Sequence, residues 1–197
     1  NNLAAGKASG QYLIFLNIDT MVTPGWVSRL VQHVETDPTI GLICPVTNFA
    51  GNEAKINVSY AGPEEMIAFS QSLAAARHGQ HTEIRVAPLY CALITRKVWN
   101  SVGALDTRYE VGMFEDDDYS LRIWDANYRV AMAEDCFIHH FGQGSFAKLA
   151  SETYNKIFEK NRARFEEKWR RPWQPHKPRA GVRSALEDRR FTPETFH

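Results

Sequence analysis

The sequence predicts an α/β fold, in which a β-sheet is flanked by helices. Short apolar runs that suit buried strands alternate with longer segments whose apolar residues recur at helical spacing. The predicted strands are 12–16, 40–44 and 89–95. The predicted helices are 24–36, 63–77 and 149–169. A chain of 197 residues can bury a hydrophobic core, so residues 1–170 are expected to belong to one domain.

The first half of the chain carries clear element signals. Tyr12–Leu16 is apolar and contains aromatic residues, which is typical of a buried strand in a parallel sheet. Pro24–Thr36 is predicted to be a helix, because proline is favoured at the first helical position. Ile40–Cys44 is the next strand. Residues 48–62 are rich in Asn, Gly and Ala and are predicted to be a surface loop suited to ligand contacts.

The second half continues the alternation. Arg96–Ser101 is predicted to be a short helical turn that Gly103 closes, since glycine commonly ends helices. The long helix at 149–169 has several of its apolar residues on one face. Residues 171–197 form a basic, proline-containing stretch, which is expected to extend from the domain without a core of its own.

The composition favours a soluble globular protein. Hydrophobic residues make up 44% of the chain and charged residues 23%. Lys+Arg and Asp+Glu number 23 each, so the overall charge does not indicate nucleic-acid binding. No apolar run approaches the roughly 18 residues of a membrane-spanning helix. Cys44, Cys91 and Cys136 lack C-x-x-C spacing, which predicts free buried thiols in a reducing, cytoplasmic compartment.

Charge is unevenly distributed along the chain. Residues 106–118 are acidic, whereas the residues after 168 are basic and include Trp173 close to Trp169. A basic tail with tryptophans can rest on an anionic membrane surface, which would be the inner face of the membrane. A solvated extension is the simpler interpretation, and we favour it.

Four consecutive carboxylates, Glu115-Asp116-Asp117-Asp118, precede a segment with helical apolar spacing. One interpretation is structural, since acidic residues at a helix start are stabilised by the helix dipole and the free backbone N–H groups. The functional interpretation makes one carboxylate a general base and another a group that positions a substrate hydroxyl. The motif alone leaves both interpretations open.

Two further motifs contain candidate metal ligands. Asn17 and Asp19 follow the strand Tyr12–Leu16, and residues two apart at a strand end can share one face. Oxygen ligands at this edge of an α/β sheet suit a divalent cation bound to phosphate, and an Asx turn is the structural alternative. His139 and His140 follow a strand-like stretch. Because adjacent side chains on a strand face opposite ways, only one histidine can point into a given cleft.

These motifs follow the order found in family 2 glycosyltransferases, and residues 2 to 170 resemble the middle of such an enzyme. The resemblance is carried by Asn2, Ala8, Gly10, Tyr12-Leu13, Asn17-Ile18-Asp19-Thr20, Pro24-Gly25-Trp26, Arg96–Val98, Val102-Gly103, Leu105-Asp106, Glu115–Asp118, Arg122, His139–Gly142, Ser145-Phe146, Asn161, Phe165 and Lys168-Trp169. The chain is similar in particular to bacterial members that build surface polysaccharides. It departs at Ala4, where the family often has glycine, and it carries Asn-x-Asp where Asp-x-Asp is also found.

The resemblance implies a GT-A fold, a mixed sheet flanked by helices that resembles a Rossmann unit. It also implies inverting, metal-dependent transfer of a sugar from a nucleotide-sugar donor to a hydroxyl of a saccharide or glycoconjugate acceptor. By motif position, Asp19, with Asn17 beside it, would hold a Mg²⁺ or Mn²⁺ ion on the donor diphosphate. His140 or His139 would complete that site.

The same resemblance divides the acidic motif into two roles. Asp116 is expected to deprotonate the acceptor hydroxyl, and Glu115 to orient the acceptor. Asp117 and Asp118 are expected to serve the fold as residues of the first helical turn. Arg122 lies four residues beyond Asp118, so the two can form an ion pair across one turn.

Family members have a leading half that grips the nucleotide, and it would precede Asn2. The chain is therefore expected to lack half of the donor site and to be inactive alone. One alternative is a carbohydrate-binding or scaffold module that keeps the fold without turnover. Another is a metal-dependent hydrolase that uses Asp19, Asp116 and His140.

Overall fold

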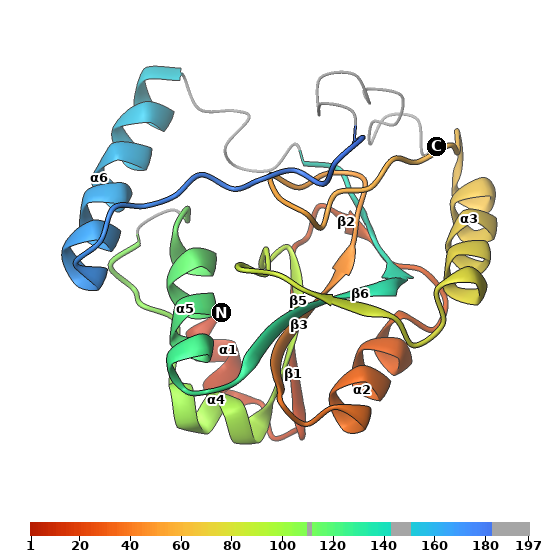
Figure 1. Ribbon diagram of the computed structural model, residues 1–197, viewed down its shortest axis with the longest axis horizontal. Coiled ribbons are helices and arrows are strands. Elements are labelled where there is room, and N and C mark those ends of the chain that lie inside the picture. Colours follow the sequence, from red (N-terminus) through yellow and green to blue (C-terminus); the bar gives the residue numbers. More distant parts are fainter. Residues whose placement is uncertain (110–111, 143–150, 183–197) are drawn as a thin grey trace.

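The computed structural model describes residues 1–109, 112–142 and 151–182, and Figure 1 shows a central sheet with helices on both sides. The main sheet has five strands in the order β1-β5-β3-β6-β4. Its strands are β1 Tyr12–Leu16, β3 Ile40–Val46, β4 His81–Glu83, β5 Cys91–Thr95 and β6 Arg129–Phe137. Within this part of the chain, β3 and β6 are parallel neighbours and the other neighbouring pairs are antiparallel. The sheet is therefore mixed, as the resemblance implied.

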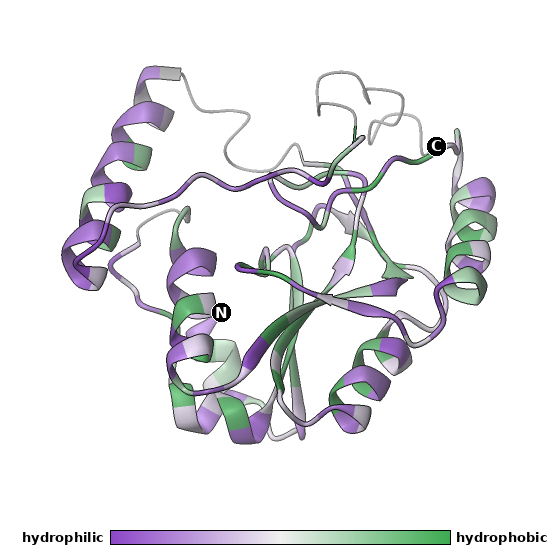
Figure 2. Ribbon diagram, viewed as in Figure 1, coloured by the Kyte–Doolittle hydropathy of each residue, from purple (hydrophilic) through white to green (hydrophobic). Residues whose placement is uncertain are grey.

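Helices cover both faces of this sheet. They are α1 Asn2–Lys7, α2 Trp26–Thr36, α3 Pro63–Ala76, α4 Arg96–Val102, α5 Glu115–Asp125 and α6 Ser151–Trp169. Ile43 belongs to the core cluster of Leu30 in α2, whereas Leu42 belongs to that of Ile123 in α5. Because successive side chains on a strand point to opposite faces, α2 and α5 cover opposite faces of the sheet. Figure 2 shows the hydrophobic strands enclosed between these helices.

The predicted elements agree with the structure to within two residues, although α2 begins at Trp26, so Pro24 does not take the first helical position; residues 149–150 of the last predicted helix lie outside the described residues. The pairing of the first strand differs from the prediction. β1 has the predicted bounds, yet it runs antiparallel to β5, so the expected parallel pairing is wrong. Leu13 and Phe15 are buried, Tyr12 and Ile14 are partly buried, and Leu16 is 43% exposed. The run looked like a parallel core strand because both of its faces carry apolar side chains, which does not determine strand direction.

The chain after α6 turns back and crosses the molecule towards β6 (Figure 1). We call residues 170–182 the C-terminal segment. Arg179 forms an ion pair with Glu134 of β6, with an N–O distance of 2.9 Å. Arg85 donates a hydrogen bond of 2.7 Å to the carbonyl of Gln174. Most residues of this segment are exposed to solvent, but these contacts tie it to the domain; residues 183–197 lie outside the described residues.

The three cysteines are free and buried, as predicted. Burial raises the pKa of the thiols of Cys44, Cys91 and Cys136, so their reactive thiolate forms are disfavoured. Among the helices of the described ranges, none has the length and apolar character needed to cross a lipid bilayer.

Candidate active site

Two of the predicted motifs meet at the carboxyl end of β1. The chain turns there, because the N–H of Asn17 donates to the carbonyl of Tyr90 at 2.8 Å and the Thr20 hydroxyl donates to the Asn17 carbonyl at 2.7 Å. Two short strands, β2 Thr20–Met21 and β7 His139–His140, then form an antiparallel pair. Thr20 lies opposite His140 in this pair. The small sheet therefore joins the turn that carries Asp19 to the histidines.

Asp19 and His140 are neighbours across this small sheet. Asp19 Oδ2 lies 3.4 Å from His140 Nε2, and the two side chains are 21% and 13% exposed. His140 Nδ1 lies 3.0 Å from the carbonyl oxygen of Phe49. Because a carbonyl only accepts hydrogen bonds, Nδ1 carries a proton, and Nε2 is the ring nitrogen that lies on the side of Asp19. A carboxylate oxygen and an imidazole nitrogen are thus placed to bind one cation together.

His140 is held by residues that the sequence motifs did not single out. The Tyr90 ring stacks on its imidazole with a centroid distance of 4.9 Å and 13° between the planes. Asn48 accepts from the backbone N–H of His140 at 2.8 Å and donates to its carbonyl at 3.1 Å. Gly142 has φ 63°, and a Cβ there would lie 2.3 Å from the ring of Phe49. The predicted ligand-contact loop at 48–62 was the one signal for Asn48 and Phe49, and no motif pointed to Tyr90.

His139 faces the other way and belongs to the core. It is 1% exposed, and its Nδ1 forms a hydrogen bond of 2.5 Å with the Tyr60 hydroxyl. Burial, together with the nearby His140, lowers its pKa to about 4, so its ring is neutral at physiological pH. Of the two histidines offered as metal ligands, the structure therefore brings His140 beside Asp19 and places His139 in the interior.

Few protein groups could serve as metal ligands beside Asp19 and His140, which we call the candidate metal pair. Across residues 1–109, 112–142 and 151–182, no three His, Cys, Asp or Glu side chains gather in a group that could hold a metal ion. Asn17, predicted beside Asp19, is exposed at the same turn. Mg²⁺ is commonly bound by one or two protein groups, with water and phosphate as its other ligands. Two protein ligands are therefore compatible with a cation that arrives with an anionic ligand.

The acidic motif forms the first turn of α5, at the end of the sheet where β1 also finishes (Figure 1). Met113 and Phe114 precede the helix with φ 71° and 72°, a left-handed conformation that is unfavourable for bulky residues. Asn161 of α6 donates to the carbonyls of Gly112 and Met113 at 2.9 and 3.3 Å. The start of the acidic turn is thus held in an unusual conformation by contacts from α6.

Asp118, the last carboxylate of the motif, is paired inside the domain. It is 1% exposed, and its carboxylate lies 2.6 Å from Lys168 Nζ and 3.9 Å from the Arg122 guanidinium. The second contact confirms the predicted pair one helical turn apart. Trp169 Nε1 donates to the same carboxylate at 2.9 Å. Lys168 and Trp169 come from the end of α6, so Asp118 anchors that helix to α5.

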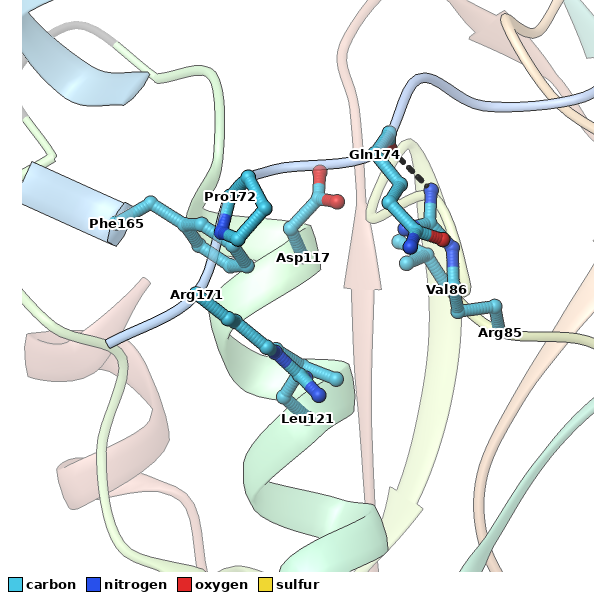
Figure 3. A pocket seen from close by; sticks show the side chains of 8 residues that line it. All are labelled: Arg85, Val86, Asp117, Leu121, Phe165, Arg171, Pro172 and Gln174. Carbon is cyan, nitrogen blue, oxygen red and sulfur yellow. Dashed lines mark hydrogen bonds between the residues drawn. The ribbon is translucent and has the colours of Figure 1, made fainter. Parts of the chain in front are cut away.

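Asp117 is covered by the C-terminal segment. Trp173 Nε1 donates to its Oδ1 at 2.9 Å, and His176 Nε2 donates to its Oδ2 at 3.1 Å. Figure 3 shows this carboxylate directed from α5 towards the segment around Pro172 and Gln174. A pocket of about 180 Å³ lies beside it, lined by Arg85, Val86, Asp117, Leu121, Phe165, Arg171, Pro172 and Gln174. Both oxygens of Asp117 are therefore engaged by donors within the protein.

Glu115 and Asp116 have a different environment from the other two carboxylates. Glu115 Oε2 is buried and has no hydrogen-bond partner among the described residues, while Asp116 Oδ1 accepts from the backbone N–H of Asp117 at 3.0 Å. Burial raises the pKa of both carboxyls, and repulsion from Glu115 and Asp117 raises that of Asp116 further, to well above its ordinary value. A raised pKa suits a carboxylate that takes up a proton near neutral pH.

Three comparisons show which known proteins this chain resembles. Residues 1–103 match the family described as Glycosyl transferase family 2. The O-antigen biosynthesis protein RfbC of Myxococcus xanthus is 28% identical over 164 residues, which are 71% of this chain and 12% of that protein. The crystal structure of GalNAc-T7 with UDP, GalNAc and Mn²⁺ aligns with a TM-score of 0.52 and 17% identity, over 80% of this chain and 33% of that one. The structural likeness supports the predicted GT-A fold, and the chain spans a minor part of each relative.

Proposed function

This chain belongs to glycosyl transferase family 2, and from that premise we propose that it transfers a sugar from a nucleotide-sugar donor to a hydroxyl of a saccharide or glycoconjugate acceptor. We further propose that transfer needs a divalent cation and inverts the configuration of the sugar. The name of the Myxococcus relative, an O-antigen biosynthesis protein, supports a surface polysaccharide as the product. The observation that carries the proposal is the pairing of Asp19 with His140 at the carboxyl end of β1.

The donor half of the site would be built on this pair. Asp19 would offer a carboxylate oxygen and His140 its Nε2, a donor set that fits Mn²⁺ and, through the oxygen, Mg²⁺. The Phe49 carbonyl supports this use, because it keeps the imidazole proton on the nitrogen that faces away from Asp19. A bound cation would stabilise the negative charge that develops on the departing diphosphate. Asn17, exposed at the same turn, would contact the donor.

The acceptor half would use the first turn of α5. The acceptor oxygen forms a bond to the anomeric carbon while the bond from that carbon to the diphosphate oxygen breaks. Asp116 takes the proton that the acceptor hydroxyl loses, a role that its raised pKa supports. Glu115, with a buried oxygen to which no described residue donates a hydrogen bond, would orient the hydroxyl. Attack from the side opposite the leaving group produces the inversion.

A screen of nucleotide sugars against the full-length protein tests this proposal. Release of nucleoside diphosphate and transfer of label to a saccharide acceptor are both measured. Asp19→Ala should abolish transfer and also remove the Mn²⁺ dependence of nucleotide binding in calorimetry. Asp125→Asn is the control, because Asp125 is an exposed carboxylate at the end of α5 opposite the acidic motif.

Two results would contradict the proposal. The metal role fails if the wild-type protein binds nucleotide equally well with and without Mn²⁺. If no donor is turned over but saccharides still bind, the non-catalytic carbohydrate-binding alternative replaces the transferase.

A further inference from the structure

The C-terminal segment holds one carboxylate of the acidic turn at both of its oxygens. The indole N–H of Trp173 reaches Asp117 Oδ1 at 2.9 Å, and His176 Nε2 lies 3.1 Å from Oδ2. Asp117 is 4% exposed, so water has little access to the carboxylate. A buried carboxylate that lost either donor would keep its desolvation cost without compensation. The two donors therefore fix the position of Asp117.

Trp173 also contacts the residue from which the helix begins. Its ring centroid lies 5.2 Å from that of Phe114, with an interplanar angle of 61°. Phe114 has the left-handed φ of 72°, and such a conformation persists only where the surroundings hold it. Trp173 is itself anchored to α6, because its backbone N–H donates to Glu166 at 3.0 Å. One side chain thus braces both the start of α5 and its third residue.

The backbone of Asp117 contacts the proposed base directly. The backbone N–H of Asp117 donates to Asp116 Oδ1 at 3.0 Å. Glu115 and Asp116 stand on the same helical turn, so a shift of that turn moves all three residues. Repulsion among the neighbouring carboxylates favours such a shift unless donors oppose it.

We propose that Trp173 and His176 are positioning residues for sugar transfer, which clamp Asp117 and so hold Asp116 and Glu115 where the acceptor hydroxyl is deprotonated. The inference rests on the proposed function and deepens it. The C-terminal segment serves the acceptor half of the reaction. The donor half is built on other elements, so donor binding does not depend on the clamp.

Trp173→Phe in the full-length protein tests the clamp, because it keeps a ring against Phe114 and removes the indole N–H. Trp124→Phe is a matched control, because Trp124 lies in α5 and its Nε1 donates to a carbonyl, that of Arg85, at 3.1 Å. We expect Trp173→Phe to lower kcat by about 10- to 100-fold, since small displacements of a catalytic group have effects of this size. The donor KM should stay close to the wild-type value, and Trp124→Phe should keep the wild-type kcat.

Two variants of His176, one conservative and one not, give a second test. His176→Gln keeps an N–H that can donate to Asp117, whereas His176→Ala removes it. The glutamine variant should retain most of the wild-type kcat, and the alanine variant should fall towards Trp173→Phe. A purely structural role would lower the Tm of either variant without separating their kcat values in this way.

The outcomes separate this inference from the proposed function. Equal kcat for Trp173→Phe and Trp124→Phe overturns the clamp while leaving the transferase in place. A wild-type protein that transfers no sugar contradicts the proposed function instead. In that case ¹³C NMR titration of the carboxyl groups tests whether Trp173 and His176 hold the acidic turn in position. A change in the titration of Asp116 that is larger in Trp173→Phe than in Trp124→Phe supports it, and equal titration overturns it.

Discussion

Tyr90 lies flat against His140, with 4.9 Å between the ring centroids, and its own carbonyl accepts the backbone N–H of Asn17. One residue thus braces both sides of the candidate metal pair, the turn after β1 and the histidine of β7. The Tyr90 hydroxyl donates to the carbonyl of Pro45 at 2.7 Å, which ties the ring to β3. The pair is therefore supported from the core of the sheet.

Replacing Tyr90 should weaken metal binding without removing a ligand. Tyr90→Leu loses both the stacked ring and the hydroxyl, and we expect Mn²⁺ affinity to fall by about tenfold or more, as for other supporting residues of metal ligands. Tyr90→Phe keeps the ring and should have a smaller effect. Calorimetric titration of Mn²⁺ in the presence of a nucleoside diphosphate measures both. Equal losses in the two variants would show that the stacking does not orient His140.

The two carboxylates of the acceptor half should differ in kinetics. Removing a general base typically lowers the rate by about 10²- to 10⁴-fold. Asp116→Asn should therefore lose transfer while its donor affinity stays at the wild-type level. Glu115→Gln should mainly raise the acceptor KM. Steady-state kinetics with varied acceptor distinguishes them, and the reverse result would make Glu115 the base.

The raised pKa of Asp116 should reduce stability at neutral pH. A carboxyl whose pKa is higher in the folded state than its unfolded value of 3.8 binds protons more tightly when folded. Stability is then lost as the pH rises from about 4 through the folded pKa. Asp116→Asn removes this titration, so its Tm should exceed that of the wild type at pH 7 and approach it near pH 4. Scanning calorimetry across this range checks the prediction, with Asp125→Asn as the control, and a pH-independent gain would be evidence against it.

Lys168 should matter more for stability than an exposed lysine on the same helix. Its Nζ lies 2.6 Å from Asp118 and 2.9 Å from Asp106. Lys168→Met leaves the buried Asp118 without its nearest cation, and we expect a loss of about 1–3 kcal/mol in the free energy of unfolding. Lys156→Met breaks an exposed pair with Glu152 and should cost less than about 1 kcal/mol. Urea denaturation compares the two, and similar losses would contradict the prediction.

The sequence predicted element positions better than their pairing. The start of α5 at Glu115 and the end of α4 at Gly103 follow from local signals, acidic residues in a first turn and a glycine at a helix end. The direction of β1 relative to β5 depends on a partner far along the chain. Nothing within Tyr12–Leu16 encodes that partner, so the expected parallel pairing was wrong.

The motif residues of the candidate site could be predicted from the sequence, but the residues that hold them in position could not. Asp19 and His140 belong to recognisable motifs, although their contact depends on the non-local pairing of β2 with β7. Tyr90 sits in no motif. Trp173 and His176 lie in a stretch with dense charge and several prolines, a composition that ordinarily indicates chain outside a core. Their contacts with Asp117 depend on the direction in which the chain leaves α6. No local sequence pattern predicts that direction.

Shortening the polypeptide after residue 170, where the sequence pattern ends the domain, would remove both donors of Asp117 and uncover the ring of Phe114. The shortened protein would open Asp117 to water and expose aromatic surface around Phe114, and newly exposed aromatic surface favours aggregation during expression. Arg179 holds the same segment to β6 through Glu134. The last helix is therefore a poor guide to where the polypeptide can be cut, and a soluble form should retain the residues as far as Val182.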